Sequence, residues 1–259
     1  MNLLFDRLFA TNQGSRIFLS FSEQNKPIRY DKFLNEIKCM ASRLKTLGLE
    51  KGDRLVLQIE KSHHVFTIYG ACVQLGIIFI PINTNYTAVE VEYFIKDSEC
   101  KCFITTTKML KDLVSQDKKV SCKIETIDAD YTGSFFSDFD ENEPLEIIEK
   151  QNEDDIAAIL YTSGTTGRSK GAMLSQKNLL SNALTLSESW AFTTSDVLLH
   201  ALPIYHTHGL FVATNIALAS GSQIRFLKKF GEDDIIANLP YSTVMMGVPT
   251  FYTRLLASS

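Results

Sequence analysis

The chain has 259 residues, of which 45% are hydrophobic and 22% are charged, and its formal net charge is −4. These values are ordinary for a globular protein, and the length suffices for one large domain or two smaller ones. A mildly acidic chain without a Lys/Arg-rich run does not indicate nucleic-acid binding, and no apolar stretch reaches the length of a membrane span.

The first ten residues predict a short amphipathic helix, because Asp6 and Arg7 interrupt an apolar stretch that would otherwise suit a secretory signal. Five cysteines are scattered along the chain. Cys100 and Cys102 lie close together and lack a second ligand pair, so the spacing does not indicate a zinc site. We therefore expect reduced, mostly buried thiols in a cytoplasmic protein.

Strands and helices alternate over the first hundred residues. The predicted strands are 16–21, 54–59, 77–82 and 102–105, with a brief strand or turn at 27–30, and the predicted helices are 30–47, 62–75 and 87–97. In the first of these helices Phe33, Ile37, Met40 and Leu44 recur at helical spacing. This alternation predicts an α/β fold whose parallel-rich sheets are flanked by crossover helices.

Residues 117–153 are rich in acid and weak in pattern, which is typical of a solvated connection. We expect this connection to end a first α/β subdomain, residues 1–150. A second subdomain, residues 151–259, would then begin just before a Gly/Ser/Thr-rich loop.

That loop is the strongest functional signal in the chain. The apolar run 156–161 predicts a buried strand, and it leads into a stretch with hydroxyl side chains, three glycines and Lys170. Glycines allow close backbone approach to a ligand, while N–H groups, hydroxyls and a lysine attract an anion. The pattern favours phosphate binding over a flexible surface loop, which is the common alternative for such composition.

Two named motifs do not fit this loop. A P-loop requires Lys directly after Gly, whereas Arg168 and Ser169 separate Gly167 from Lys170. Residues 167–171 match the letters G-x-S-x-G of a hydrolase nucleophile elbow. That elbow needs its serine at a sharp turn directly after a strand, and Ser169 lies eight residues beyond Tyr161. A hydrolase is therefore disfavoured, and labelling of Ser169 by a fluorophosphonate would revive it.

The second half continues the alternation. Ser175 is a suitable N-cap for a helix reaching about residue 190. Further strands are predicted at 196–202, 222–227 and 243–248, and further helices at 211–220, at 232–238 and from 249 onward. His206 and His208 follow the first of these strands, where open α/β sheets place ligands. The two could be a metal pair, although a third ligand is lacking, or buried structural histidines.

The sequence Y-T-S-G-T-T-G-R-S-K-G at Tyr161–Gly171 resembles the signature of the adenylate-forming superfamily, which includes acyl-CoA synthetases, luciferases and peptide-synthetase adenylation domains. Leu44–Val56 and Gly76–Tyr86 resemble two further motifs of that family, which we interpret as turns and packing. In the family this loop wraps the β- and γ-phosphates of ATP. The resemblance assigns to ATP the following residues: Thr162, Ser163, Gly164, Thr165, Thr166, Gly167 and Lys170.

The later motifs resemble malonyl-CoA synthetases within this superfamily. Tyr205-His206 matches the motif whose histidine lies near the acyl carboxylate and the α-phosphate, and His208 matches an acyl-pocket position. Arg254 matches an arginine that contacts the distal carboxylate of a dicarboxylic acid. A buried second carboxylate requires a partner, which arginine can provide in bidentate form. Without the resemblance, Arg254 would equally suit a solvated helix.

The resemblance implies a carboxylic acid–CoA ligase that forms AMP and uses ATP, Mg²⁺ and CoA, with Thr166, Lys170 and His206 at the reacting centre. Family members run longer, and their Mg²⁺-binding Glu, ribose-binding Asp and C-terminal catalytic domain would lie beyond residue 259. We thus expect part of a large N-terminal domain that forms malonyl-CoA poorly by itself; robust turnover would refute this. The alternatives are a ligase for a medium-chain or aryl acid, and a non-catalytic nucleotide-binding fragment.

Overall fold

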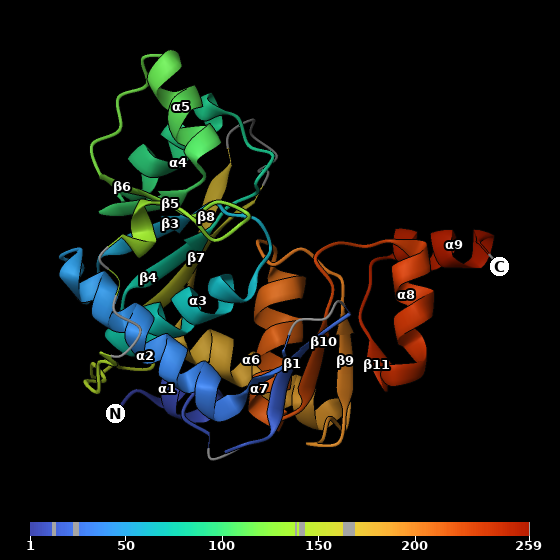
Figure 1. Cartoon of the computed structure of the whole chain (residues 1–259). Helices are drawn as coiled ribbons and strands as arrows, with labels where there is room; N and C mark the ends of the chain where they lie inside the picture. The colour runs from blue at the N-terminus through green and yellow to red at the C-terminus, as the bar shows by residue number, and fades with distance from the viewer. Residues whose placement is uncertain (12–13, 23–25, 138, 140–142, 163–168, 259) are drawn as a thin grey trace. The chain divides into compact units, whose positions relative to one another are not determined.

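The computed structural model describes residues 1–11, 14–22, 26–137, 139, 143–162 and 169–258 (Figure 1). By their contacts these residues form two compact units. Unit 1 comprises Met1–Leu3 and Glu36–Gln176, and unit 2 comprises Leu4–Asn35 and Lys177–Ser259. The described residues between 151 and 176 fall in unit 1 by their contacts, and the expected subdomain boundary at residue 150 stays a prediction.

Unit 1 is built on a six-stranded sheet with the strand order β6-β5-β3-β4-β7-β8. Its strands are β3 (Arg54–Leu57), β4 (Ile78–Pro81), β5 (Cys102–Thr105), β6 (Lys123–Thr126), β7 (Ile156–Thr162) and β8 (Lys170–Ser175). All neighbouring pairs are parallel except β7 and β8, which are antiparallel. The helices of this unit are α3 (His63–Leu75), α4 (Ala88–Ser98) and α5 (Thr107–Ser115), with a 3₁₀ turn η1 (Ser134–Phe136).

The central strands of unit 1 are buried on both faces, as parallel strands covered by crossover helices require. All four residues of β5 are buried, and the core packs Val56, Ile80 and Phe103 against apolar residues of α4. Helix α4 begins at a capping box formed by Thr87 and Glu90, which satisfies backbone N–H groups at the helix start. The apolar residues of the strands thus determine that both faces of the sheet are covered, and Thr87 and Glu90 determine where α4 begins.

Unit 2 contains a five-stranded sheet with the order β11-β9-β10-β1-β2, parallel except for β2. Its strands are β1 (Ile17–Phe21), β2 (Ile28–Arg29), β9 (Val197–His200), β10 (Gln223–Phe226) and β11 (Val244–Met245). Its helices are α1 (Leu3–Leu8), α6 (Gln176–Ser189), the π-helix η2 (His208–Thr214), α7 (Asn215–Ser220), α8 (Glu232–Asn238), the 3₁₀ turn η3 (Leu239–Tyr241) and α9 (Pro249–Ala257). Helix α2 (Tyr30–Thr46) begins in unit 2 and continues into unit 1.

A buried tyrosine ties the start of α2 to the segment between α7 and β10. The Tyr30 hydroxyl lies 2.7 Å from the Ser222 carbonyl oxygen and 3.2 Å from that of Ala217. Burial raises the pKa of Tyr30, so the hydroxyl remains a donor to these carbonyl groups. This contact and the pairing of β1 with β10 both join the N-terminal segment of unit 2 to its later residues.

The predicted α/β fold with parallel-rich sheets and flanking helices is confirmed, but several element assignments differ. Helix α5 was not predicted. Lys170 and Gly171 are the first residues of β8 and not loop residues. The acid-rich connection contains β6 and η1. The predicted helix 211–220 begins earlier, at His208, and its first part is a π-helix.

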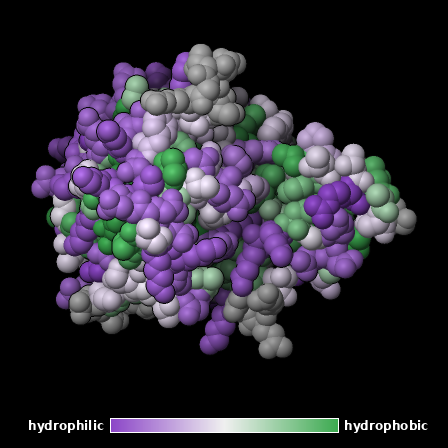
Figure 2. All heavy atoms as spheres, turned by 90° about the horizontal axis from the view of Figure 1, so that it is seen from above, coloured by the Kyte–Doolittle hydropathy of each residue, from purple (hydrophilic) through white to green (hydrophobic). Residues whose placement is uncertain are grey.

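Apolar side chains remain exposed on the last elements of unit 2. They are Ile236, Leu239, Tyr241, Tyr252 and Leu256. Figure 2 shows apolar atoms among polar ones on the right of the view, the side on which α8 and α9 are drawn in Figure 1. These side chains add little to the core of the unit. Within the described ranges, no helix combines the length and the apolar content needed to cross a membrane.

Candidate functional site

In each unit, candidate residues follow the carboxyl ends of strands, where open α/β sheets bind ligands. In unit 1 the Gly/Ser/Thr-rich loop follows β7. In unit 2 the segments that follow β9, β10 and β11 carry His206, Glu232 and Arg254. Because β9, β10 and β11 are parallel neighbours, these three segments leave the same edge of their sheet.

The two ends of the phosphate-loop candidate are held by the β7–β8 pair. Thr162 and Lys170 face each other in its antiparallel register, so the two strands bring both ends of the loop together. Both residues are exposed. The other five predicted phosphate ligands lie outside the described residues: Ser163, Gly164, Thr165, Thr166 and Gly167.

Two tyrosines anchor the base of this loop to α4. The Tyr93 hydroxyl donates a hydrogen bond of 2.8 Å to the Ser169 carbonyl oxygen, and the Tyr161 hydroxyl donates one of 2.7 Å to an Asp97 carboxylate oxygen. Burial, reinforced by the hydrogen bond to Asp97, raises the pKa of Tyr161. The Tyr161 hydroxyl therefore remains a donor, and the two hydrogen bonds hold the strand ends that flank the loop.

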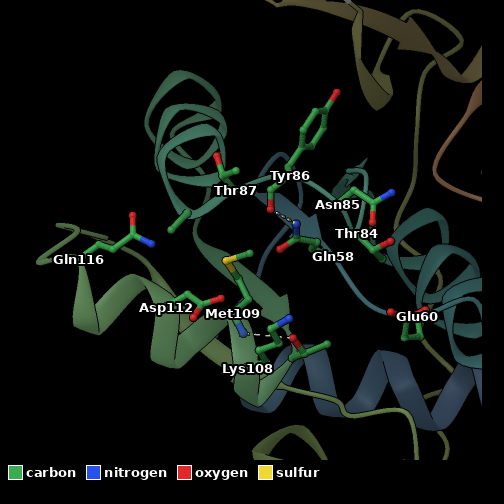
Figure 3. Close-up of a pocket in the computed structure, with 12 residues that line it drawn as sticks. Gln58, Glu60, Thr84, Asn85, Tyr86, Thr87, Lys108, Met109, Asp112 and Gln116 are labelled. Atoms are coloured by element: carbon green, nitrogen blue, oxygen red, sulfur yellow. Dashed lines mark hydrogen bonds between the residues drawn. The ribbon is translucent and has the colours of Figure 1, made fainter.

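A polar pocket of about 450 Å³ lies in unit 1 at the carboxyl ends of β3, β4 and β5. Its lining residues are Gln58, Glu60, Thr84, Asn85, Tyr86, Thr87, Ala88, Thr106, Lys108, Met109, Asp112 and Gln116. In Figure 3 the Gln58 amide points to the Tyr86 backbone, where its Nε2 donates to the carbonyl oxygen at 3.3 Å. The same Nε2 lies 2.9 Å from the Asn83 carbonyl oxygen. Buried Gln58 thus fixes one wall of the pocket.

Sequence reasoning missed this pocket. The motif at Gly76–Tyr86 was interpreted as turns and packing, yet Thr84, Asn85 and Tyr86 line the cavity. The sequence signal that could have indicated the pocket is the position of these three polar residues directly after an apolar strand. Neither Thr162 nor Lys170 lines the pocket, so it is a feature separate from the described ends of the phosphate loop.

His206 lies on the segment that links β9 to η2, and His208 is the first residue of η2. The His206 side chain is exposed, and its ring centroid lies 4.5 Å from that of Tyr205. Partial burial lowers the pKa of His206, which favours the neutral ring. His208 is half-buried and is the first residue of the π-helix. A π-helical turn inside a helical segment is frequent at functional sites.

Arg254 lies on α9 and is held by two neighbours in unit 2. Its Nε donates to the Glu232 Oε1 at 2.6 Å, and its guanidinium carbon lies 4.7 Å from the centroid of the Phe230 ring. Phe230 in turn stacks on Phe251, with a centroid distance of 4.0 Å. The hydrogen bond from Arg254 lowers the pKa of Glu232, so this carboxylate stays ionised. The Arg254 side chain is nevertheless 56% exposed.

The structure provides no metal centre among the residues that it describes. In that part of the chain no group of three or more His, Cys, Asp or Glu side chains could hold a metal ion. All five cysteines are free thiols, and four of them are buried.

These features define an α/β protein with a phosphate-loop candidate after one strand and a histidine pair after another. The sequence profile described as "AMP-binding enzyme" matches residues 7–259. The chain belongs to this family.

Similar proteins come from several organisms. A malonate–CoA ligase, mitochondrial ACSF3 of Mus musculus, is 33% identical over 187 residues, which cover 70% of this chain and 31% of that protein. A CoA ligase of Gibberella moniliformis is 28% identical over 247 residues, covering 91% of this chain and 40% of that protein. The crystal structure of ATP-bound MatB from Rhodopseudomonas palustris matches 98% of this chain with 43% identity and a TM-score of 0.90.

The matches cover only part of each relative. This chain spans 51% of the MatB chain, and smaller shares of the two curated ligases. A structure of o-succinylbenzoate CoA synthetase from Bacillus subtilis, with 23% identity and a TM-score of 0.82, shows the shared fold.

Proposed function

We propose that the protein takes part in AMP-forming ligation of malonate to CoA. The observation that carries this proposal is the antiparallel β7–β8 pair, which brings Thr162 and Lys170 together at the ends of a loop with the adenylate-forming signature. Membership of the AMP-binding family and similarity to malonate–CoA ligases support the assignment. The chain would contribute the ATP loop and the acyl-binding residues.

In the proposed reaction a carboxylate oxygen of malonate attacks the α-phosphorus of ATP, which forms an acyl-adenylate and releases pyrophosphate. The CoA thiol then attacks the acyl carbon and displaces AMP. For the first step the protein must position two anions and stabilise charge on the phosphates. We assign the phosphates to Thr162, Lys170 and the loop between them, including Thr166.

His206 is proposed to lie at the reacting carboxylate. Its pKa is lowered by burial, so the ring is neutral near pH 7 and can donate one hydrogen bond without binding the carboxylate as a fixed ion pair. His208, which is the first residue of the π-helix, is proposed to line the acyl pocket.

Arg254 is proposed to bind the distal carboxylate of malonate. A guanidinium carries five N–H donors, so the Nε contact with Glu232 involves only one of them. The Phe230 ring beneath the guanidinium restricts its orientation. A fixed guanidinium loses less freedom on binding a carboxylate than a mobile one.

Mg²⁺ would neutralise charge on the ATP phosphates in such a reaction, and CoA is the second substrate. The proposed compartment is the cytoplasm, where free thiols such as these persist. Subcellular fractionation checks this, and recovery in an organelle would contradict it.

Pyrophosphate exchange into ATP tests the activity. We expect exchange to depend on malonate and to be weak with acetate or octanoate. If exchange is faster with octanoate or an aryl acid than with malonate, that acid is the substrate instead. Such an acid is the second candidate because Arg254 is exposed and already contacts Glu232. Binding of ATP without exchange for any acid would instead support a non-catalytic nucleotide-binding role.

A further inference from the structure

A buried histidine at the end of β9 contacts the π-helix that carries His208. His200 is the last residue of β9 and is 1% exposed. Its Nε2 lies 2.8 Å from the carbonyl oxygen of Gly209, the second residue of η2. Since a carbonyl oxygen only accepts, this contact requires the tautomer that carries the proton on Nε2.

A second buried donor reaches the same oxygen atom. The Thr214 hydroxyl, on the last residue of η2, donates to the Gly209 carbonyl at 3.0 Å, and its oxygen lies 3.4 Å from His200 Nε2. Thr214 is fully buried. One carbonyl thus receives two side-chain donors, one from the sheet and one from the far end of the π-helix.

The backbone around Gly209 is closely packed. A Cβ atom at Gly209 would lie 2.1 Å from the Pro203 carbonyl oxygen, so the turn rests directly on the segment that leaves β9. The Leu210 N–H donates to the His206 carbonyl oxygen at 3.0 Å, which joins the His206 backbone to the same turn. The position of Gly209 therefore determines where the backbone of both His206 and His208 can lie.

We propose that His200 is a positioning residue for the acyl-binding histidines: its Nε2–H···O bond to Gly209, shared with Thr214, sets the π-helical turn that presents His206 and His208. His200 does not touch the substrate and acts through the backbone. The identity of the ligand, malonate, rests on the proposed function. The effect of His200 on the rings of His206 and His208 does not depend on that function.

The test compares His200→Leu, which removes the donor, with His200→Gln, whose side-chain amide can donate from a similar position. Ring ¹⁵N–¹H spectra of the ¹⁵N-labelled 259-residue chain report on all its histidines. We expect His200→Leu to shift the ring signals of His206 and His208, and His200→Gln to restore them. His63 and His64, which belong to the other unit, are internal controls and should not move.

Malonate binding, measured by calorimetry with ATP present, provides the second readout. His200→Leu should weaken it about tenfold, as expected for one buried hydrogen bond, and His200→Gln should stay within about threefold of the parent. Equal effects of both substitutions, or unchanged His206 and His208 signals in His200→Leu, would overturn the positioning role. If the parent chain binds no malonate, the proposed substrate fails, while the ring signals still decide the role of His200.

A second pair of variants covers the case in which His200→Leu does not fold. Thr214→Val removes the other donor to the Gly209 oxygen, and Thr214→Ser keeps it. Thr214→Val should shift the same two ring signals, and Thr214→Ser should leave them in place. Unshifted signals in Thr214→Val would show that this carbonyl group does not control the histidines.

Discussion

The substitution Gly209→Ala should destabilise unit 2 strongly, because the site has no room for a methyl group. The added Cβ would lie 2.1 Å from the Pro203 carbonyl oxygen and 3.2 Å from the Leu202 Cβ. An unstrained carbon–oxygen contact needs about 3.3 Å, so the two segments must separate by about 1 Å. The nearest obstacle is a backbone atom, which cannot rotate away as the end of a side chain can.

The expected loss of stability combines two terms. Overpacking of this kind costs about 1–3 kcal/mol. The shift also stretches the hydrogen bonds that His200 and Thr214 make with the Gly209 carbonyl, each of which contributes about 1 kcal/mol when intact. We expect a total of about 2–4 kcal/mol.

Urea denaturation measures this loss, and Gly231→Ala is the matched control. A Cβ at Gly231 would meet the Asp234 Oδ2 at 3.0 Å, and this carboxylate can rotate away. Gly231 is the N-cap of α8, where alanine is less suitable than glycine, so we expect a loss of about 1 kcal/mol or less. A loss below about 1 kcal/mol for Gly209→Ala, or equal losses for both variants, would refute the steric argument.

Three further predictions concern the loop, an acid-sensitive histidine and the arginine pair. Tyr93→Phe removes the donor to the Ser169 carbonyl and should weaken ATP binding about threefold to fivefold in a fluorescence titration; unchanged affinity would contradict the anchoring role. Burial lowers the pKa of His64 from 6.5 to about 3, so the unfolded state binds more protons and stability should fall as the pH drops from about 6.5 toward 3. His64→Gln should reduce the slope of the unfolding free energy against pH by up to about 1.4 kcal/mol per pH unit. An unchanged slope in urea denaturation would mean that other groups cause it. Glu232→Gln removes a negative charge beside Arg254 and should raise malonate affinity about threefold by calorimetry; weaker binding would mean that Glu232 mainly orients the arginine.

Much of the fold could be predicted because hydrophobic periodicity and turn residues agree. The helix that starts at Tyr30 matches the prediction closely, since its apolar residues recur at helical spacing. The strand Cys102–Thr105 also matches, as a short apolar run that is buried throughout. Strand β8 was missed because its residues are mostly exposed and include Gly171, so no apolar alternation marks it. Its strand structure comes from pairing with β7, which is a tertiary effect.

The π-helix could not be predicted from periodicity. The apolar residues from Leu210 onward suggest an ordinary helix, and no local pattern marks the π-helical turn. Its contact with His200, which the sequence placed inside a strand, was not identified by any motif. The polar pocket was missed for a similar reason, because its walls come from three different strand ends.

The candidate site was predicted from motifs and remains a proposal. The motifs identified the loop after β7 and the histidines after β9 because strand ends and small polar residues leave a recognisable pattern. They did not identify Glu232 and Phe230 as neighbours of Arg254, since these residues precede it by more than twenty positions and follow another strand. Contacts of this kind are determined by packing and not by local sequence.

The most direct test of the central claim is a calorimetric titration of malonate and acetate into the chain saturated with ATP, repeated with Arg254→Ala. A charge-assisted hydrogen bond to the distal carboxylate should make malonate bind at least about tenfold more tightly than acetate. Arg254→Ala should remove this preference and leave acetate binding unchanged. Equal affinity for the two acids in the parent chain, or a malonate preference that survives in Arg254→Ala, would contradict the proposed dicarboxylate site.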